Sequence, residues 1–219
     1  MVGFHFAFDL NLYGLLAPPQ RFLSDPFWTG QRTAIVTLFM LCAGVSQAVT
    51  GQAGRSAGRF WRRWAQIAGC AALVSVGSAL MFPETWISFG VLHAMAAMLL
   101  IARFALQPLA HRPALLLALS AAVLAAPRVA AHAVFDSRWG NWTGLVTHLP
   151  YAEDYVPLAP WLAVFIWGLV LGRWLARTGW LTGWAPAPLA AMGRWPLTIY
   201  MVHQPLLLGA LTLWMKLRT

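Results

Sequence analysis

The sequence predicts an all-α protein, a polytopic transmembrane helix bundle of about seven helices, and three observations support this fold class. Of the 219 residues, 60% are hydrophobic and only 10% are charged, which is more apolar than the surface of a water-soluble domain tolerates. Seven apolar stretches are separated by clusters rich in proline, glycine or arginine. At about 20 residues for each spanning helix, these stretches use nearly the whole chain. We therefore expect one integral-membrane domain over residues 1–219.

The expected helices follow the apolar stretches in order. They cover residues 1–16, 33–52, 64–82, 88–106, 114–131, 158–176 and 189–214. The first stretch reaches Pro18 after about 16 residues, short of a comfortable span, and no Lys or Arg precedes it. We expect this helix to be truncated, with a piece missing upstream. The one long connection, residues 132–157, has a length at which loops often shape a site.

The distribution of arginines predicts how the bundle lies in the membrane. A net charge of +9 would suggest nucleic acid for a soluble protein, but here the arginines gather in alternate loops. They are Arg55, Arg59, Arg62, Arg63, Arg103, Arg112, Arg173 and Arg177. By the positive-inside rule this face is cytoplasmic, and the 132–157 loop lies on the other side. The lipid bilayer is thus the expected partner and nucleic acid is not; a homo-oligomer stays open.

Four ionisable residues lie in the apolar stretches: His5, Asp9, His93 and His203. Such side chains are costly in hydrocarbon unless they face a polar cavity or a partner, so they are the candidate catalytic residues. His5 and Asp9 are four residues apart and share a helix face, so the carboxylate can orient the imidazole as a base. His203 precedes Pro205, which should kink the helix beside it. Hydrogen bonding between helices is the alternative for each histidine.

Other residues are candidates for binding. Guanidinium groups match phosphate oxygens, which makes the following arginines candidates for a phosphorylated cofactor: Arg55, Arg59, Arg62, Arg63 and Arg194. Topology and anionic lipid explain the same arginines. Asp154 opens the sixth helix, where helix capping and substrate binding are both open, and Trp161 and Tyr200 complete the substrate-binding candidates. The spacing of Gly168 and Gly172 predicts close helix packing. No metal-ligand spacing occurs, so we expect no metal.

Five phrases, in this order, resemble the bacterial branch of the heparan-α-glucosaminide N-acetyltransferase catalytic-domain family. They are residues 1–10 (MVGFHFAFDL), 39–46 (FMLCAGVS), 88–93 (SFGVLH), 154–161 (DYVPLAPW) and 193–205 (GRWPLTIYMVHQP). The resemblance covers nearly the whole chain. Each phrase is short and partly hydrophobic, but their order and spacing make the set fairly specific.

The resemblance implies a membrane acyltransferase of the bacterial inner membrane, with a periplasmic 132–157 loop. Acetyl would pass from cytosolic acetyl-CoA to an amino sugar or glycan hydroxyl on the outer face, and His5 is the position matched to the family's central histidine. Direct transfer and transfer through an acyl-histidine are both open. A proton-coupled transporter and a non-catalytic membrane subunit are the alternatives from other classes, and the missing internal repeat argues against the transporter.

Overall fold

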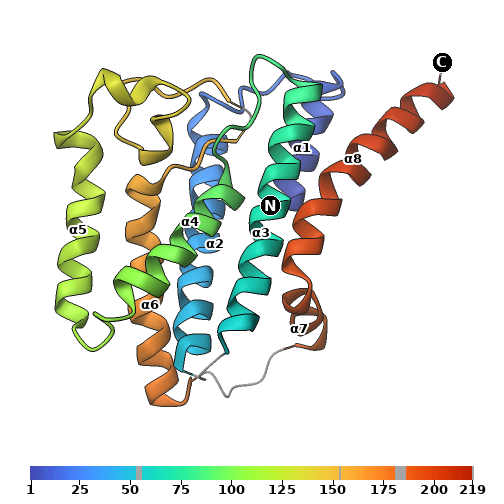
Figure 1. Ribbon diagram of the computed structural model, residues 1–219. Coiled ribbons are helices and arrows are strands. Elements are labelled where there is room, and N and C mark those ends of the chain that lie inside the picture. Colours follow the sequence, from blue (N-terminus) through green and yellow to red (C-terminus); the bar gives the residue numbers. More distant parts are fainter. Residues whose placement is uncertain (53–55, 153, 181–185, 219) are drawn as a thin grey trace. The chain divides into compact units, whose positions relative to one another are not determined.

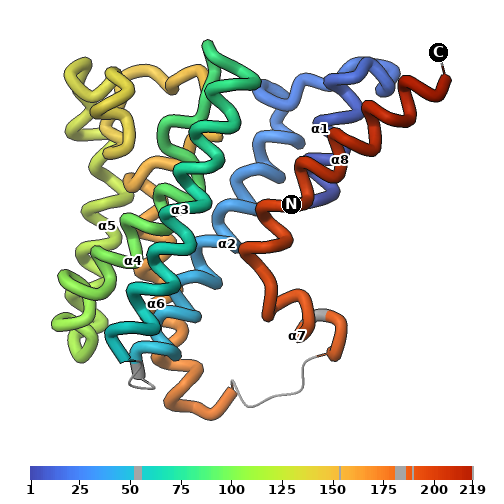
Figure 2. The backbone as a smooth tube through the Cα atoms, turned by 45° about the vertical axis from the view of Figure 1, so that its right-hand side comes forward, coloured from blue at the N-terminus to red at the C-terminus, as the bar shows by residue number. Residues whose placement is uncertain are grey.

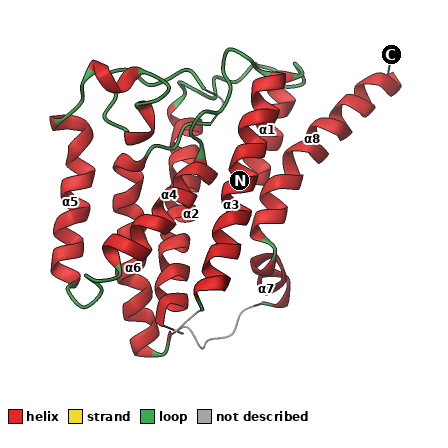
Figure 3. Cartoon of the chain, in the orientation of Figure 1, coloured by secondary structure: helices red, strands yellow, loops and turns green. Residues whose placement is uncertain are grey.

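The computed structural model describes residues 1–52, 56–152, 154–180 and 186–218. Within these ranges every regular element is helical and no strand occurs, which confirms the all-α prediction (Figure 3). The α-helices are labelled in Figure 1. They are α1 (Val2–Leu12), α2 (Pro26–Gln52), α3 (Ala57–Met81), α4 (Val91–Ile101), α5 (Pro113–Val129), α6 (Leu158–Thr178), α7 (Ala187–Arg194) and α8 (Pro196–Arg218). A π-helical turn, Ala102–Leu106, continues α4, and two 3₁₀ turns, Ala133–Asp136 and Asn141–Thr143, lie in the long loop.

Four described helices are long and apolar enough to cross a membrane. They are Pro26–Gly51, Ala57–Met81, Leu158–Thr178 and Pro196–Arg218. The segments Val91–Leu106 and Pro113–Val129 are apolar but shorter. An α-helix rises 1.5 Å per residue, so about 20 residues cover the hydrocarbon core. The fold is therefore compatible with an integral membrane protein.

Several helix boundaries differ from those expected: α1 ends at Leu12 and not at 16, and α3 begins at Ala57 and not at 64. Proline explains two further differences. The helix predicted from residue 33 begins at Pro26, because proline suits the first helical position and Asp25 Oδ1 accepts the Phe27 N–H at 2.8 Å. The prediction of one helix over 189–214 was wrong, since α7 ends at Arg194 and α8 begins at Pro196. Pro196 lacks an N–H and disfavours a helical conformation in the residue before it. That residue, Trp195, has a φ of −123° and a ψ of 38°.

The chain divides into two compact units. The first unit is Met1–Val36 with Gly183–Thr219, and the second unit is Thr37–Thr182, so the division falls within α2. In the first unit α1 packs beside α8 (Figure 2), and the Tyr13 hydroxyl hydrogen-bonds the Thr212 Oγ1 at 2.7 Å. Phe22, almost fully buried, packs its ring against Trp28 with centroids 4.1 Å apart. These contacts fix the end of α1 against α8 and the loop after α1 against the start of α2.

The core of the second unit forms where α6 packs against α5 and α4 (Figure 1). Phe165 and Ile166 of α6 are fully buried there, together with Met98 and Leu116. Burial of side chains of this size contributes about 1.5–3 kcal/mol each where the exposed alternative is water. On another face of α6, glycines meet the backbone of α2 directly.

The long loop between α5 and α6 is held by Asp136. Asp136 Oδ1 accepts the Thr147 N–H at 2.7 Å, and Oδ2 accepts the Thr147 hydroxyl at 2.6 Å. These bonds hold the pKa of Asp136 below its ordinary value of 3.8. Further along, the Tyr155 hydroxyl donates to the Asn141 carbonyl at 2.7 Å, and burial raises the pKa of Tyr155 to about 12. The loop therefore carries a defined structure of its own.

The loop should loosen in acid. Because the pKa of Asp136 is lower in the fold than in the unfolded chain, its stabilisation is full above pH 3.8 and is lost as the pH falls through the folded value. Asp136→Asn removes the charge and one acceptor, so the protection of the Thr147 amide from hydrogen exchange at pH 7 should fall. Glu84→Gln, an equal loss of charge at an exposed position, is the control. Equal protection in the two variants would contradict this role for Asp136.

Candidate functional site

The first unit brings three of the four candidate catalytic residues together. Its α1–α8 cluster consists of His5 and Asp9 on α1 and of His203 and Gln204 on α8. The imidazole centroids of His5 and His203 lie 5.0 Å apart, with an interplanar angle of 60°. Gln204 Nε2 donates to Asp9 Oδ1 at 2.8 Å, which joins the two helices through side chains. Residues 195 positions apart in sequence thus meet in one polar cluster.

Asp9 is the most unusual member of this cluster, because its side chain is 0% exposed. The sequence predicts that it orients His5, but in the structure its hydrogen bond comes from Gln204. Its second oxygen, Oδ2, has no hydrogen-bond partner among the described residues. A buried carboxylate with incomplete partners lowers stability, so its presence favours a functional explanation.

The hydrogen bonds of His203 define which of its nitrogens carries the proton. Nδ1 lies 2.6 Å from the Tyr200 carbonyl oxygen and 3.2 Å from that of Ile199. Carbonyl oxygens only accept, so we assign the proton to Nδ1. In the neutral ring Nε2 then bears the lone pair. That nitrogen is buried and has no partner in the described part of the chain.

Three atoms of the cluster are therefore hydrogen-bond acceptors without a described donor. Asp9 Oδ2, Gln204 Oε1 and the neutral His203 Nε2 are acceptors, and each is buried without a described partner. An amine or a hydroxyl supplies the N–H or O–H groups that such atoms need. Sequence reasoning missed Gln204; the signal was a second polar side chain at membrane depth, directly after His203.

His93 lies in the second unit, and both of its ring nitrogens are engaged there. Nδ1 accepts the Gly90 N–H at 3.2 Å, so the proton is on Nε2, which lies 3.1 Å from Ser75 Oγ. The Ser75 hydroxyl in turn donates to the Ile87 carbonyl at 2.6 Å. This arrangement fixes the start of α4 and leaves no ring nitrogen of His93 as a base.

Asp154 also serves the start of α4. Its Oδ2 accepts the Val91 N–H at 2.8 Å, satisfying a backbone donor in the first turn of that helix. The sixth helix begins at Leu158, as expected, so Asp154 precedes α6 by four residues and caps α4. Gly90 makes this contact possible, because a Cβ at that position would collide with the Asp154 carboxylate.

The remaining candidates are distributed over both units. Trp161 is half-buried near the start of α6, and the Tyr200 ring lies 5.9 Å from that of His203. Three arginines are exposed along the first turns of α3: Arg59, Arg62 and Arg63. Arg194 is exposed at the end of α7 in the first unit. Arg55 lies outside the described residues.

Comparison with known families decides what kind of protein carries this cluster. A family model described as heparan-alpha-glucosaminide N-acetyltransferase, catalytic, matches residues 1–205. The chain belongs to this family. The part matched to the acetyltransferase family contains every residue of the α1–α8 cluster, and membership points to a membrane acetyltransferase activity. No curated protein and no solved structure matches the chain.

Proposed function

We propose that the protein transfers an acetyl group from cytosolic acetyl-CoA to an amine or hydroxyl of a saccharide at the outer face of a bacterial inner membrane. Family membership supports acetyl transfer. The observation that carries the location of the chemistry is His203, whose Nδ1–H is held by a backbone carbonyl while Nε2 stays buried and without a described partner. Such a nitrogen suits proton abstraction, which general-base catalysis requires.

In the proposed step His203 Nε2 takes the proton from the acceptor amine or hydroxyl as that atom attacks the thioester carbonyl. A new C–N or C–O bond forms, the C–S bond breaks, and the imidazolium returns the proton to the departing CoA thiolate. The buried Asp9 carboxylate, held by Gln204, offsets the positive charge on the ring. His5 completes the site beside His203, with the two imidazole centroids 5.0 Å apart.

The other candidates have supporting roles in this proposal. In the first unit, Tyr200 contacts the saccharide beside His203, and the exposed Arg194 binds a phosphate of the donor. In the second unit, His93 and Asp154 hold the start of α4. We further propose that residues 1–219 work as one domain.

The proposal is tested with protein in nanodiscs, radiolabelled acetyl-CoA and a panel of amino sugars and neutral sugars. Wild type should form acetylated sugar, and His5→Ala should lower the rate at least tenfold, because the imidazole packed beside the base His203 is lost. His111→Ala, at an exposed loop histidine, should match wild type. Absence of transfer by wild type, or a wild-type rate in His5→Ala, would refute the assignment. Sugar flux in liposomes without CoA would favour a transporter instead.

A further inference from the structure

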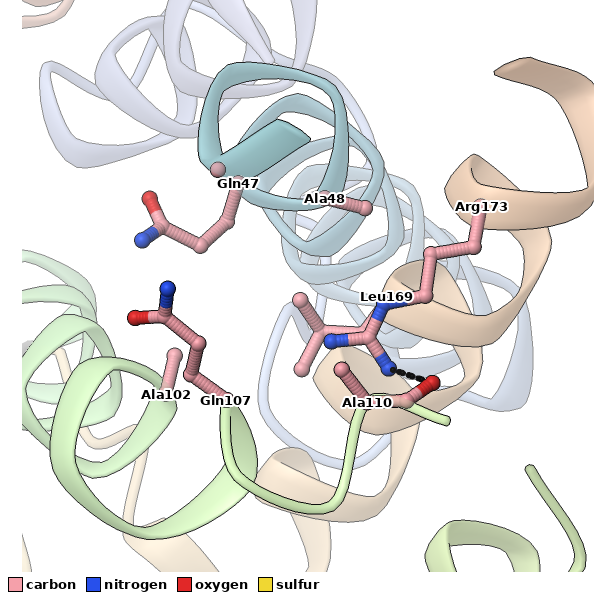
Figure 4. Close-up of a pocket in the computed structure, with 8 residues that line it drawn as sticks. Gln47, Ala48, Ala102, Gln107, Ala110, Leu169 and Arg173 are labelled. Carbon is pink, nitrogen blue, oxygen red and sulfur yellow. Dashed lines mark hydrogen bonds between the residues drawn. The ribbon is translucent and has the colours of Figure 1, made fainter. Parts of the chain in front are cut away.

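A pocket of about 130 Å³ lies in the second unit, where α2 and α6 approach their C-terminal ends (Figure 4). It is lined by Gln47, Ala48, Gly51, Ala102, Gln107, Ala110, Leu169 and Arg173. It contains none of the residues proposed for acetyl transfer. Its small residues leave space between three polar side chains that enter from α2, from the segment after the π-helical turn and from α6.

Arg173 supplies the charge of this pocket. It is half-buried, and its Nη1 donates to the Ala110 carbonyl at 3.0 Å (Figure 4). An arginine has five N–H donors, and the others of Arg173 have no partner among the described residues. A guanidinium that has lost part of its hydration is stabilised by a nearby anion.

The second unit offers Arg173 no carboxylate at this end. Its described acidic residues are Glu84, Asp136 and Asp154, and they lie after α3, after α5 and before α6, at the other ends of these helices (Figure 1). Asp136 and Asp154 are bonded to Thr147 and Val91 respectively. The single ion pair within the described ranges joins His148 to Asp136. No described carboxylate of the second unit is therefore a counter-ion of Arg173.

Two amides complete a set of donors in the pocket. Gln47 and Gln107 extend toward one another across it (Figure 4), and neither amide hydrogen-bonds a described residue. Amide N–H groups and an arginine fork match the oxygens of a tetrahedral oxyanion. Arg177, one turn further along α6, adds positive potential that raises the local concentration of anions.

We propose that the Arg173 pocket binds a phosphate group. The volume suits one phosphate and is below the 300 Å³ or so of a site that encloses a whole drug-sized ligand, so the rest of the ligand extends out of the pocket. Both a soluble phosphate compound and a phospholipid headgroup present this chemistry. Binding at this pocket does not require the acetyl transfer proposed above.

The test measures ligand-induced thermal stabilisation without turnover, in three arms. Nanodiscs of phosphatidylcholine receive pyrophosphate in one arm and CoA in another, and the third replaces part of the lipid with phosphatidylglycerol. Arg173→Gln should weaken the binding of whichever phosphate ligand stabilises wild type by about tenfold or more, because hydrogen bonds to charged groups are strong. Arg173→Lys keeps the charge and loses the guanidinium fork, so its affinity for the ligand should lie between those of wild type and Arg173→Gln. Arg177→Gln, an exposed arginine on the same helix, should stay within about threefold of wild type.

The arms separate the sources of the phosphate. Stabilisation by pyrophosphate or CoA that depends on Arg173 identifies a soluble ligand, and stabilisation by phosphatidylglycerol alone identifies a lipid. Gln107→Ala, at an exposed position, keeps the Arg173–Ala110 bond and should weaken binding severalfold. This variant keeps the proposal testable if the Arg173 variants do not fold. Arg173-independent stabilisation in every arm, or an equal loss in Arg177→Gln, would overturn the proposal. His203→Gln should bind phosphate as wild type does, so failure of the catalytic proposal is distinguishable.

Discussion

His203→Gln will lower the turnover number for acetyl transfer by about 10²- to 10⁴-fold, the usual contribution of a general base. Glutamine is polar and of similar length, but its amide does not take up a proton in the transition state. In the proposed function His203 is the base, because the Tyr200 carbonyl fixes the ring proton on Nδ1, 2.6 Å away, and leaves Nε2 to react. The KM for acetyl-CoA should change little, since the loss is in the transition state.

The measurement is steady-state transfer of radiolabelled acetyl by protein in nanodiscs. His111→Gln is the matched control, with the same side-chain change at an exposed loop position. An unchanged turnover number in His203→Gln would remove His203 from the chemistry. A rise in KM alone would give it a binding role instead.

Gly168→Ala will destabilise the second unit by about 1–3 kcal/mol, the usual cost of overpacking. A Cβ on Gly168 would collide with the Leu41 carbonyl and approach Gly44 Cα to 3.0 Å. The same clash would occur from the other helix, since a Cβ added to Gly44 would collide with the backbone of Phe165 and Leu169. Backbone atoms cannot rotate out of the way, so α2 and α6 would have to separate.

The control for this packing is Gly69→Ala in α3, where a Cβ meets nothing within 4 Å. There alanine should stabilise by about 0.5–1 kcal/mol, because glycine is the more flexible residue in the unfolded chain. The two identical substitutions should therefore shift unfolding in dodecyl sulfate in opposite directions. Destabilisation of similar size in both variants would contradict the α2–α6 contact.

Hydropathy predicted the helical architecture well because apolar length is a local property. The helix boundaries at Pro26 and Pro196 were missed because proline permits a helix to begin there, and only the backbone shows where it does. Close packing at Gly168 and Gly172 was predicted from their spacing and is confirmed by the short approach to α2. Local spacing was informative there because small residues admit a neighbouring backbone.

The candidate site was predictable in its residue types and not in its pairings. Polar residues at membrane depth pointed to His5, Asp9 and His203, but the bond from Gln204 to Asp9 joins positions 195 apart. Helical spacing favoured a pairing of His5 with Asp9, whereas tertiary packing gave Asp9 a partner on another helix. The Arg173 pocket was missed for the same reason, since an arginine near a helix end is explained by topology until its neighbours are known.

The most direct test of the α1–α8 cluster as the catalytic site is the transfer rate of the His5→Ala/His203→Gln double variant, measured beside the single variants. Residues that act as a unit lose activity non-additively. The double variant should be about as slow as His203→Gln alone. Transfer at the wild-type rate by the double variant would contradict the account.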